Sequence, residues 1–204
     1  MPTPRPYHHH SLYTPRSIRI FLLHPSKDYG AELQGSLEEL YWVSRKWSSL
    51  RMPKGTKLDY VALSYVWGKQ GSGHFVIIGD SRIPITENCD KALRRIRKMR
   101  HQKRQSRNSV TPIWVDAVCI DQTPEGLDER SKQVAIMGEV YGRAYSTLAW
   151  LGEGDDESRQ VFDYCRQAKA LRGHANDIAV CIVTAWLRSR SEQRFRTYNI
   201  QFVD

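Results

Sequence analysis

Short apolar runs alternate along this chain with longer stretches in which apolar residues recur at helical spacing. Three runs are rich in β-prone residues and stop at Pro or Gly, as buried strands commonly do; they are 18–23 (IRIFLL), 60–66 (YVALSYV) and 147–151 (TLAWL). The stretch 75–86 (FVIIGDSRIPIT) has Gly79-Asp80-Ser81 between two apolar halves, which predicts a β-hairpin. The pattern therefore predicts several short strands spread over the first three quarters of the chain.

Helical spacing separates these runs. Residues 33–47 are expected to form a helix, because Leu33, Leu37, Leu40 and Trp47 fall broadly on one side. Thr86 can cap a basic helix that begins near Glu87. A third helix is expected over 128–144, with a buried face of Val134, Met137, Val140 or Tyr141, and Ala144. The acidic residues 155–157 predict the start of a fourth helix, since carboxylates are stabilising there.

Strands that alternate with helices across long connections favour βαβ units. We therefore expect an α/β fold, with a mainly parallel sheet flanked by helices in three layers and the hairpin as an insertion. Sites in such sheets form beyond the carboxyl ends of the strands.

The stretch 113–122 (IWVDAVCIDQ) is expected to be a strand, yet it carries two carboxylates. Asp116 would lie in mid-strand, where a buried charge needs a partner. We expect that partner to be a loop backbone N–H or an Arg, which would hold the turn 64–68 against the neighbouring strand. Asp121 and Gln122 would lie in the following loop. The candidate site edge comprises Ser64, Tyr65, Trp67, Gly68, Asp116, Cys119, Asp121, Gln122, Glu129 and Gly152. The alternative, which spacing alone slightly favours, is that these groups only fasten loops and cap the following helix.

Positive charge is concentrated in one place. Eight Lys or Arg and no acid lie in 94–107 (RRIRKMRHQKRQSR), which accounts for most of the net charge of +9. This run is either a nucleic-acid patch or nuclear localisation signal, or the solvated face and end of a helix. The absence of interleaved aromatic residues favours the helix face, so nucleic acid is not the expected partner.

Other classes of protein are disfavoured. The longest nearly apolar run, 178–187, is too short to span a bilayer, and residues 1–16 lack the apolar core of a secretory signal. We expect a flexible leader over 1–16 and a cytoplasmic location, or a nuclear one through the basic run. The four cysteines (Cys89, Cys119, Cys165 and Cys181) are widely separated, which favours reduced thiols and no metal site.

Several multi-residue stretches, in order, resemble the fungal heterokaryon-incompatibility (HET) domain. They are YVALSYVWG (60–68), RIPITENCDKALRRIR (82–97), IWVDAVCIDQ (113–122), ERSKQVAIMGEVYGRA (129–144) and LAWLGEGDDES (148–158), with SIRIFLL (17–23) as a leading strand. The resemblance covers residues 17–171. It implies a module that triggers cell death when incompatible hyphae fuse, and a distant likeness to TIR-type folds, some of which hydrolyse NAD. No G-x-G-x-x-G or P-loop pattern accompanies it.

The last part of the chain departs from the family. Members typically continue into a segment resembling R-x-W-F-x-R-x-W-x-x-Q-E, whereas residues 172–204 carry Trp186, Arg188, Glu192 and Gln193 in another order and spacing. We therefore treat 172–204 as a divergent or truncated tail and assign no catalytic role to Glu192.

Two functions remain. One is a cell-death effector that works through self-association or partner contact, with or without residual nucleotide binding and with no cofactor assigned. The other is an NAD-cleaving hydrolase, with NAD as substrate and Glu129, Glu153 or Glu157 as the acid.

If the basic run is a solvated helix face, replacing Arg104 and Arg107 with Gln should leave the melting temperature and the cellular distribution unchanged. Loss of nuclear accumulation, or of salt-dependent nucleic-acid binding, would instead show that the run has a partner.

Overall fold

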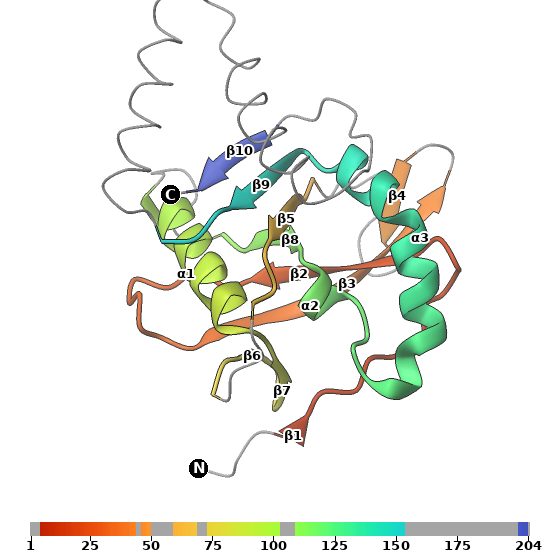
Figure 1. Ribbon diagram of the computed structural model, residues 1–204, viewed down its shortest axis with the longest axis horizontal. Coiled ribbons are helices and arrows are strands. Elements are labelled where there is room, and N and C mark those ends of the chain that lie inside the picture. The colour runs from red at the N-terminus through yellow and green to blue at the C-terminus, as the bar shows by residue number, and fades with distance from the viewer. Residues whose placement is uncertain are drawn as a thin grey trace, which may run out of the picture.

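The computed structural model describes residues 5–43, 46–49, 59–68, 73–102, 109–153 and 200–203. Its ten described strands form one mixed sheet in the order β1-β7-β6-β3-β2-β8-β5-β9-β10, with β4 paired to β3 (Figure 1). The strands are β1 (Arg5–Pro6), β2 (Ile18–Leu23), β3 (Leu33–Val43), β4 (Lys46–Ser49), β5 (Val61–Tyr65), β6 (Phe75–Ile78), β7 (Ser81–Pro84), β8 (Thr111–Trp114), β9 (Ser146–Trp150) and β10 (Ile200–Val203). The helices are α1 (Glu87–Gln102), α2 (Asp116–Cys119), the short 3₁₀ turn η2 (Pro124–Gly126) and α3 (Leu127–Arg143).

The parallel part of the sheet carries the candidate site edge. Five of the nine pairings among the described strands are parallel, and β8, β5, β9 and β10 form one continuous parallel block. Val61 is aligned with Ile113 on one side and with Ser146 on the other, so β5, β8 and β9 all end at the same edge. The predicted α/β fold with a mainly parallel sheet, and the predicted hairpin of β6 and β7, are confirmed.

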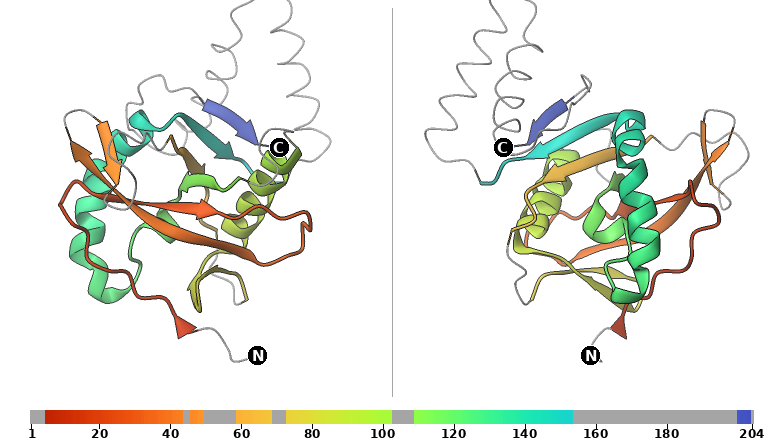
Figure 2. Two further views of the ribbon diagram at one scale, coloured as in Figure 1. Left: turned by 180° about the vertical axis from the view of Figure 1, so that it is seen from behind. Right: turned by 45° about the vertical axis from the view of Figure 1, so that its right-hand side comes forward.

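Helices α1 and α3 cover opposite faces of this block. Successive side chains of a strand point to opposite faces. Tyr65 lies beside Cys89 of α1, whereas its neighbour Ser64 lies beside Tyr141 of α3. The Tyr60 hydroxyl also donates to the Val140 carbonyl of α3, at 2.6 Å. Figure 2 shows the two helices on either side of the strands, which gives the three expected layers.

The helix expected over 33–47 is wrong, because most of this stretch is the strand β3. It pairs antiparallel with β2, residue for residue from Leu40 with Ile18 to Gly35 with Leu23. Gly35 lies so close to β2 that an added Cβ would collide with the Leu22 carbonyl oxygen and the Phe21 ring. The cross-strand contacts of a long strand outweigh a local helical spacing of leucines.

Two other expectations need correction. The strand expected over 113–122 ends at Trp114, and the chain turns at once into α2, so Asp116 opens a helix instead of lying in mid-strand. The expected buried face of α3 is correct for Val140, which is fully buried, but wrong for Val134, which is 56% exposed.

Residues 5–16, expected to be a flexible leader, run along the domain. Strand β1 pairs parallel with β7, and His9 Nε2 lies 2.9 Å from the Val118 carbonyl oxygen of α2. Nearer the sheet, the Tyr13 N–H donates to Glu39 at 2.6 Å. The described part of the leader therefore contacts three elements of the fold.

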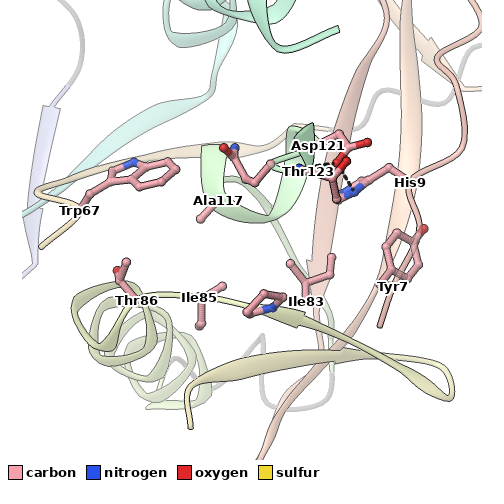
Figure 3. A pocket seen from close by; sticks show the side chains of 11 residues that line it. Tyr7, His9, Trp67, Ile83, Ile85, Thr86, Ala117, Asp121 and Thr123 are labelled. Atoms are coloured by element: carbon pink, nitrogen blue, oxygen red, sulfur yellow. Dashed lines mark hydrogen bonds and ion pairs between the residues drawn. The ribbon is translucent and has the colours of Figure 1, made fainter. Parts of the chain in front are cut away.

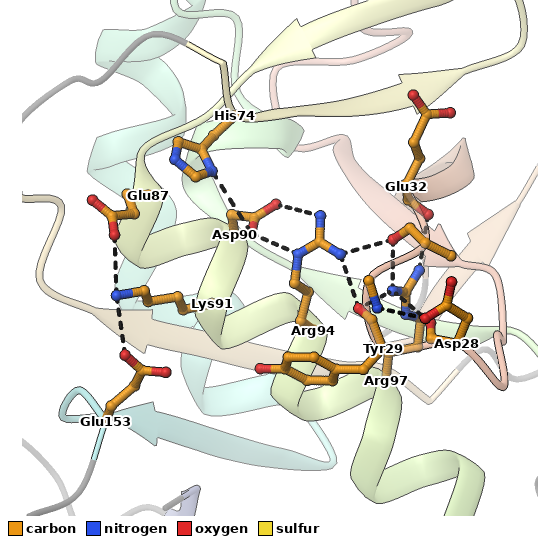
Figure 4. Close-up of polar contacts among 12 residues, drawn as sticks. Asp28, Tyr29, Glu32, His74, Glu87, Asp90, Lys91, Arg94, Arg97 and Glu153 are labelled. Atoms are coloured by element: carbon orange, nitrogen blue, oxygen red, sulfur yellow. Dashed lines mark hydrogen bonds and ion pairs between the residues drawn. The ribbon is translucent and has the colours of Figure 1, made fainter.

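The start of the basic run is part of the architecture, as Figure 4 shows. Arg94 bonds Asp90 and donates to the Tyr29 and Ala31 carbonyls at 2.9 and 2.8 Å. Arg97, only 3% exposed, donates to the Glu32 and Ala31 carbonyls, both at 2.8 Å. These two guanidinium groups fasten the loop before β3 to α1, so their charges serve the fold.

Several expectations concern residues outside the described part of the chain. They are the end of the basic run, 103–107, with Arg104 and Arg107, the helix expected after 155–157, Cys165, Cys181, and most of the tail 172–204. Among the described helices, none has the length and apolar character needed to cross a membrane.

Trp114 and Trp150 test the core. Both are buried, at 0% and 3% exposure, and Trp114 packs edge-on against Tyr141 with ring centroids 5.3 Å apart. Replacing either with Ala should lower the free energy of unfolding by about 3–5 kcal/mol, measured by denaturant titration. Tyr145→Ala, which removes a side chain of a residue that is 65% exposed, is the control and should change little.

Replacing Trp114 or Trp150 with Phe distinguishes the cost of lost packing from the cost of a lost hydrogen bond. The Trp150 indole donates to Asn88 at 2.8 Å, whereas the buried Trp114 Nε1 has no partner among the described residues. Trp150→Phe should therefore cost more than Trp114→Phe, by about 1–3 kcal/mol, because it leaves Asn88 Oδ1 unpaired. Equal costs would contradict this assignment.

Candidate functional site

The candidate site lies where β5, β8 and β9 end. The Trp67 indole, just beyond β5, donates to Asp116 Oδ2 at 2.6 Å, and the Ala117 N–H donates to Oδ1 at 2.8 Å. Because β8 ends at Trp114, Asp116 occupies the first turn of α2, directly against the segment 65–68. The carboxylate therefore does hold this turn, but its partners are an indole and one backbone N–H, with no Arg among them.

Asp116 is half-buried. Burial raises the pKa of Asp116, although the hydrogen bonds from Trp67 and Ala117 oppose that shift. The Tyr65 hydroxyl is buried beside Asp116 and Cys89 without a geometrically satisfied hydrogen bond among the described residues. Burial, the neighbouring thiol and the neighbouring carboxylate all raise the pKa of Tyr65. Burial also raises the pKa of the Cys89 thiol to about 12, so this thiol stays protonated and unreactive at neutral pH.

Asn88 connects two strand ends at this edge, and the sequence did not single it out. Its side-chain amide donates to the Val66 carbonyl after β5, and its oxygen accepts the Trp150 indole N–H of β9. Gly68 and Gly152, which follow the same two strands, have positive φ angles of 72° and 115°. Glycine is favoured where the chain must turn away in this conformation.

Asp121 and Gln122 are held by the loop itself. Gln122 Nε2 donates to the Asp116 carbonyl at 3.0 Å, and Asp121 Oδ1 accepts the Thr123 N–H at 2.9 Å. Partial burial acts to raise the pKa of Asp121, but the Thr123 hydrogen bonds and the positive charge around it prevail and lower it. Gly126 packs on this carboxylate so closely that an added Cβ would lie 2.5 Å from Asp121 Cγ.

Glu129 and Cys119, two further residues of the predicted edge, are structural. Both carboxylate oxygens of Glu129 bind Arg19, at 2.5 and 2.9 Å, and this Arg is only 5% exposed. Arg19 also donates to the Cys119 carbonyl at 3.3 Å and to the His10 carbonyl. The Cys119 thiol is 1% exposed, and burial raises its pKa to about 12. The bidentate pair of Arg19 and Glu129 joins β2 to α3. Neither the Glu129 carboxylate nor the Cys119 thiol is therefore available for chemistry.

A cavity of about 160 Å³ lies beside this edge (Figure 3). Three residues of the predicted site edge line this cavity: Trp67, Asp121 and Gln122. The other lining residues are Tyr7, His9, Ile83, Pro84, Ile85, Thr86, Ala117 and Thr123. The leader supplies one wall, in which Tyr7 and His9 pack edge-on with ring centroids 5.1 Å apart. Burial lowers the pKa of His9, so its contact with Asp121 at 3.8 Å is between a neutral ring and a carboxylate.

The predicted edge is thus assembled only in part. Ser64, Tyr65, Trp67, Gly68, Asp116 and Gln122 gather where β5 and β8 end, whereas Glu129 points to Arg19. Among the described residues, no group of three His, Cys, Asp or Glu side chains could hold a metal ion. Nothing in the pattern of the leader signalled that Tyr7 and His9 would line a cavity.

Comparison with known proteins identifies the family. Residues 60–198 match the family described as heterokaryon incompatibility protein (HET), and the chain therefore belongs to the HET family. It is similar to heterokaryon incompatibility protein 6, OR allele, of Neurospora crassa, with 32% identity over 154 residues. That alignment covers 72% of this chain and 20% of the relative, so the chain spans about a fifth of that protein's length. No solved structure matches.

The Asp116 contacts can be tested by two substitutions. Asp116→Ala removes the acceptor of the Trp67 and Ala117 hydrogen bonds and should cost about 1–3 kcal/mol of unfolding free energy. Asp116→Asn keeps one carbonyl oxygen and should cost less. Asp128→Asn, at a well-exposed carboxylate, is the matched control. Equal stability of Asp116→Ala and the control would contradict the proposed role of the carboxylate.

The comparison of wild type with Asp116→Asn also predicts a pH dependence of the unfolding free energy. Because the pKa of Asp116 is raised in the folded state, folding favours its protonated form. The contribution of Asp116 is therefore greatest below its unfolded pKa and falls as the pH rises through its folded pKa. The stability difference between wild type and Asp116→Asn should be larger at acidic than at neutral pH, measured by denaturant titration at each pH.

Proposed function

We propose that this chain is a domain of fungal nonself recognition that acts as a cell-death effector module, through self-association or contact with a protein partner. The observation that carries the proposal is the family match over 60–198, which includes β5, α1, β8, α2, α3 and β9. The printed name of the similar Neurospora crassa protein also refers to heterokaryon incompatibility. We propose the cytoplasm as its place of action.

The acids of the candidate edge favour contact over catalysis. Asp116 is held by Trp67, Asp121 by Thr123 and Glu129 by Arg19. A catalytic acid must reach a substrate atom with the proton it exchanges. Carboxylates whose oxygens accept donors from the fold serve instead to fix the loops around them.

The described acids that could cleave NAD are also engaged. Glu129 is bound to Arg19, and Glu153, exposed beyond β9, lies 3.0 Å from Lys91 (Figure 4). Glu157 lies outside the described residues.

In the basic run, Arg94 and Arg97 are bound to loop carbonyls, which leaves fewer charges for a nucleic-acid phosphate backbone. NAD cleavage and nucleic-acid binding are therefore outcomes that the experiment must separate from contact-driven death.

Inducible expression in a filamentous fungus tests the proposal. We expect the wild-type chain to reduce viability, and Tyr145→Ala to do the same because it keeps the fold. Trp114→Ala should weaken the effect, because a cost of about 3–5 kcal/mol removes a large part of the stability of a typical domain. Full viability despite accumulation of folded wild-type protein would contradict the proposal.

Incubation of the purified chain with NAD separates the mechanisms. We expect no release of nicotinamide, measured by chromatography, at protein concentrations that match those in the killed cells. Nicotinamide release that is abolished by Glu153→Gln or Glu129→Gln, with the melting temperature unchanged, would assign the death to hydrolysis instead.

A further inference from the structure

Helix α3 carries large apolar side chains on its outward face. Its inward face packs on the core through Val140, Met137 and Tyr141. Leu127 and Val134, which are 62% and 56% exposed, lie seven residues apart on the other side. Residues three, four and seven apart share a helix face. The exposed residues Ser131, Ala135 and Gly138 therefore complete an outward face of mainly small and apolar groups. Figure 2 shows α3 at the outside of the molecule.

Gly138 serves no packing purpose among the described residues. It lies inside α3, where glycine is unfavourable compared with alanine because its backbone is more flexible in the unfolded state. An added Cβ at this position would meet no described atom within 4 Å. No packing contact in the described part of the chain therefore requires a glycine here. Small residues on a helix surface allow the backbone of a second helix to approach closely.

Four charged residues beside this face alternate in sign along α3. Asp128 pairs with Lys132 at 2.5 Å, and Glu139 pairs with Arg143 at 3.0 Å, so the signs along the helix are minus, plus, minus, plus. The midpoint of the four residues lies between Ala135 and Ile136. In an antiparallel pair of these helices, Asp128 would face Arg143 of the second copy, and Lys132 would face Glu139. In a parallel pair in register, this row of charges would lie on opposite sides of the two helices, and no such pairing would form.

We propose that the outward face of α3 (Leu127, Ser131, Val134, Ala135 and Gly138) docks antiparallel on the same face of a second copy of this chain. The twofold axis passes between Ala135 and Ile136, as in other self-complementary interfaces. Val134 of one copy then lies level with Met137 and beside Gly138 of the other, where the missing side chain leaves room.

This docking rests on the self-association in the proposed function and identifies its surface. A single helix pair buries less area than a permanent dimer interface usually does. The dimer is therefore weak, and it forms when the local concentration rises. Such a surface suits a module whose effect must stay off until copies are gathered.

Sedimentation equilibrium of the chain 1–204 over a concentration series tests the docking. We expect a monomer–dimer equilibrium whose dissociation constant rises at least about tenfold in Gly138→Arg. The melting temperature of this variant should stay equal or rise, because a helix-interior glycine has been replaced. Val110→Arg adds the same charge at a residue that is 42% exposed and is not part of the proposed face, and should leave the dissociation constant unchanged.

Charge reversal tests the antiparallel register. Asp128→Lys and Arg143→Glu should each weaken the dimer, because each places like charges opposite one another twice. The two substitutions together restore opposite signs between the copies, so the dissociation constant should return towards the wild-type value. The double variant disrupts both pairs within the helix, so a gain in helix stability cannot explain that recovery.

A chain that stays monomeric throughout, a dimer that Gly138→Arg leaves intact, or a folded double variant without recovery would each overturn the docking. If the monomeric chain still caused cell death, the docking would fail and the proposed function would stand through a different partner. If the dimer formed as described without any effect on viability, the docking would stand and the proposed function would fail.

Discussion

The hydrogen bond between the Trp67 indole and the Asp116 carboxylate fixes the edge on which the rest of this domain depends. A carboxylate out of water is costly, and the raised pKa of Asp116 reflects that cost. It is tolerated because two donors, Trp67 and Ala117, meet its two oxygens. The bond therefore joins the segment after β5 to the first turn of α2, two elements that are far apart in the sequence.

The position of Asp116 also determines the arrangement of the loop after α2 and of the start of α3. Its carbonyl accepts the Gln122 amide, which sets the course of the loop after α2. Asp121 then receives the Thr123 N–H, and Arg130 of α3 donates to the Asp121 and Thr123 carbonyls at 3.2 and 2.8 Å. The beginning of α3 is thus oriented by a loop that α2 itself positions. At the sheet, Glu129 and Arg19 complete the attachment of α3 to β2.

The parts of this fold that the sequence predicted are those in which local pattern and tertiary contact agree. β5 and β9 are apolar runs that end at glycine-containing turns, the hairpin has its turn at Gly79, and Thr86 does accept the Cys89 N–H at the start of α1, at 3.3 Å. The parallel sheet, and hence the meeting of Asp116 with the segment 65–68, follows from the long connections between these elements. These features required only the neighbouring residues and the known geometry of crossovers.

The misplaced features are those in which a distant contact decides the local structure. Leu33, Leu37 and Leu40 fit a helix until β2 is available as a partner, and the close approach at Gly35 is visible only in three dimensions. Asp121 and Gln122 do lie in a loop, as expected, but a four-residue helix is too short to show periodicity, so α2 was missed. Asn88 and His9 became part of the edge because of what lies opposite them, Trp150 and Val118, which spacing along the chain does not reveal.

The strand ends and the outward face of α3 differ in how far their side chains are bonded within the domain. At the strand ends, Asp116, Asp121 and Asn88 have their polar atoms joined to the fold, so this edge supplies rigidity and a small cavity. On the outward face of α3 the opposite holds, because Leu127 and Val134 remain exposed and no described side chain packs on Gly138. In the proposed docking, the edge holds α3 in place and the outward face of that helix makes the contact. A substitution that loosens Asp116 would then act on the docking indirectly, through the orientation of α3, whereas one at Gly138 would act on it directly.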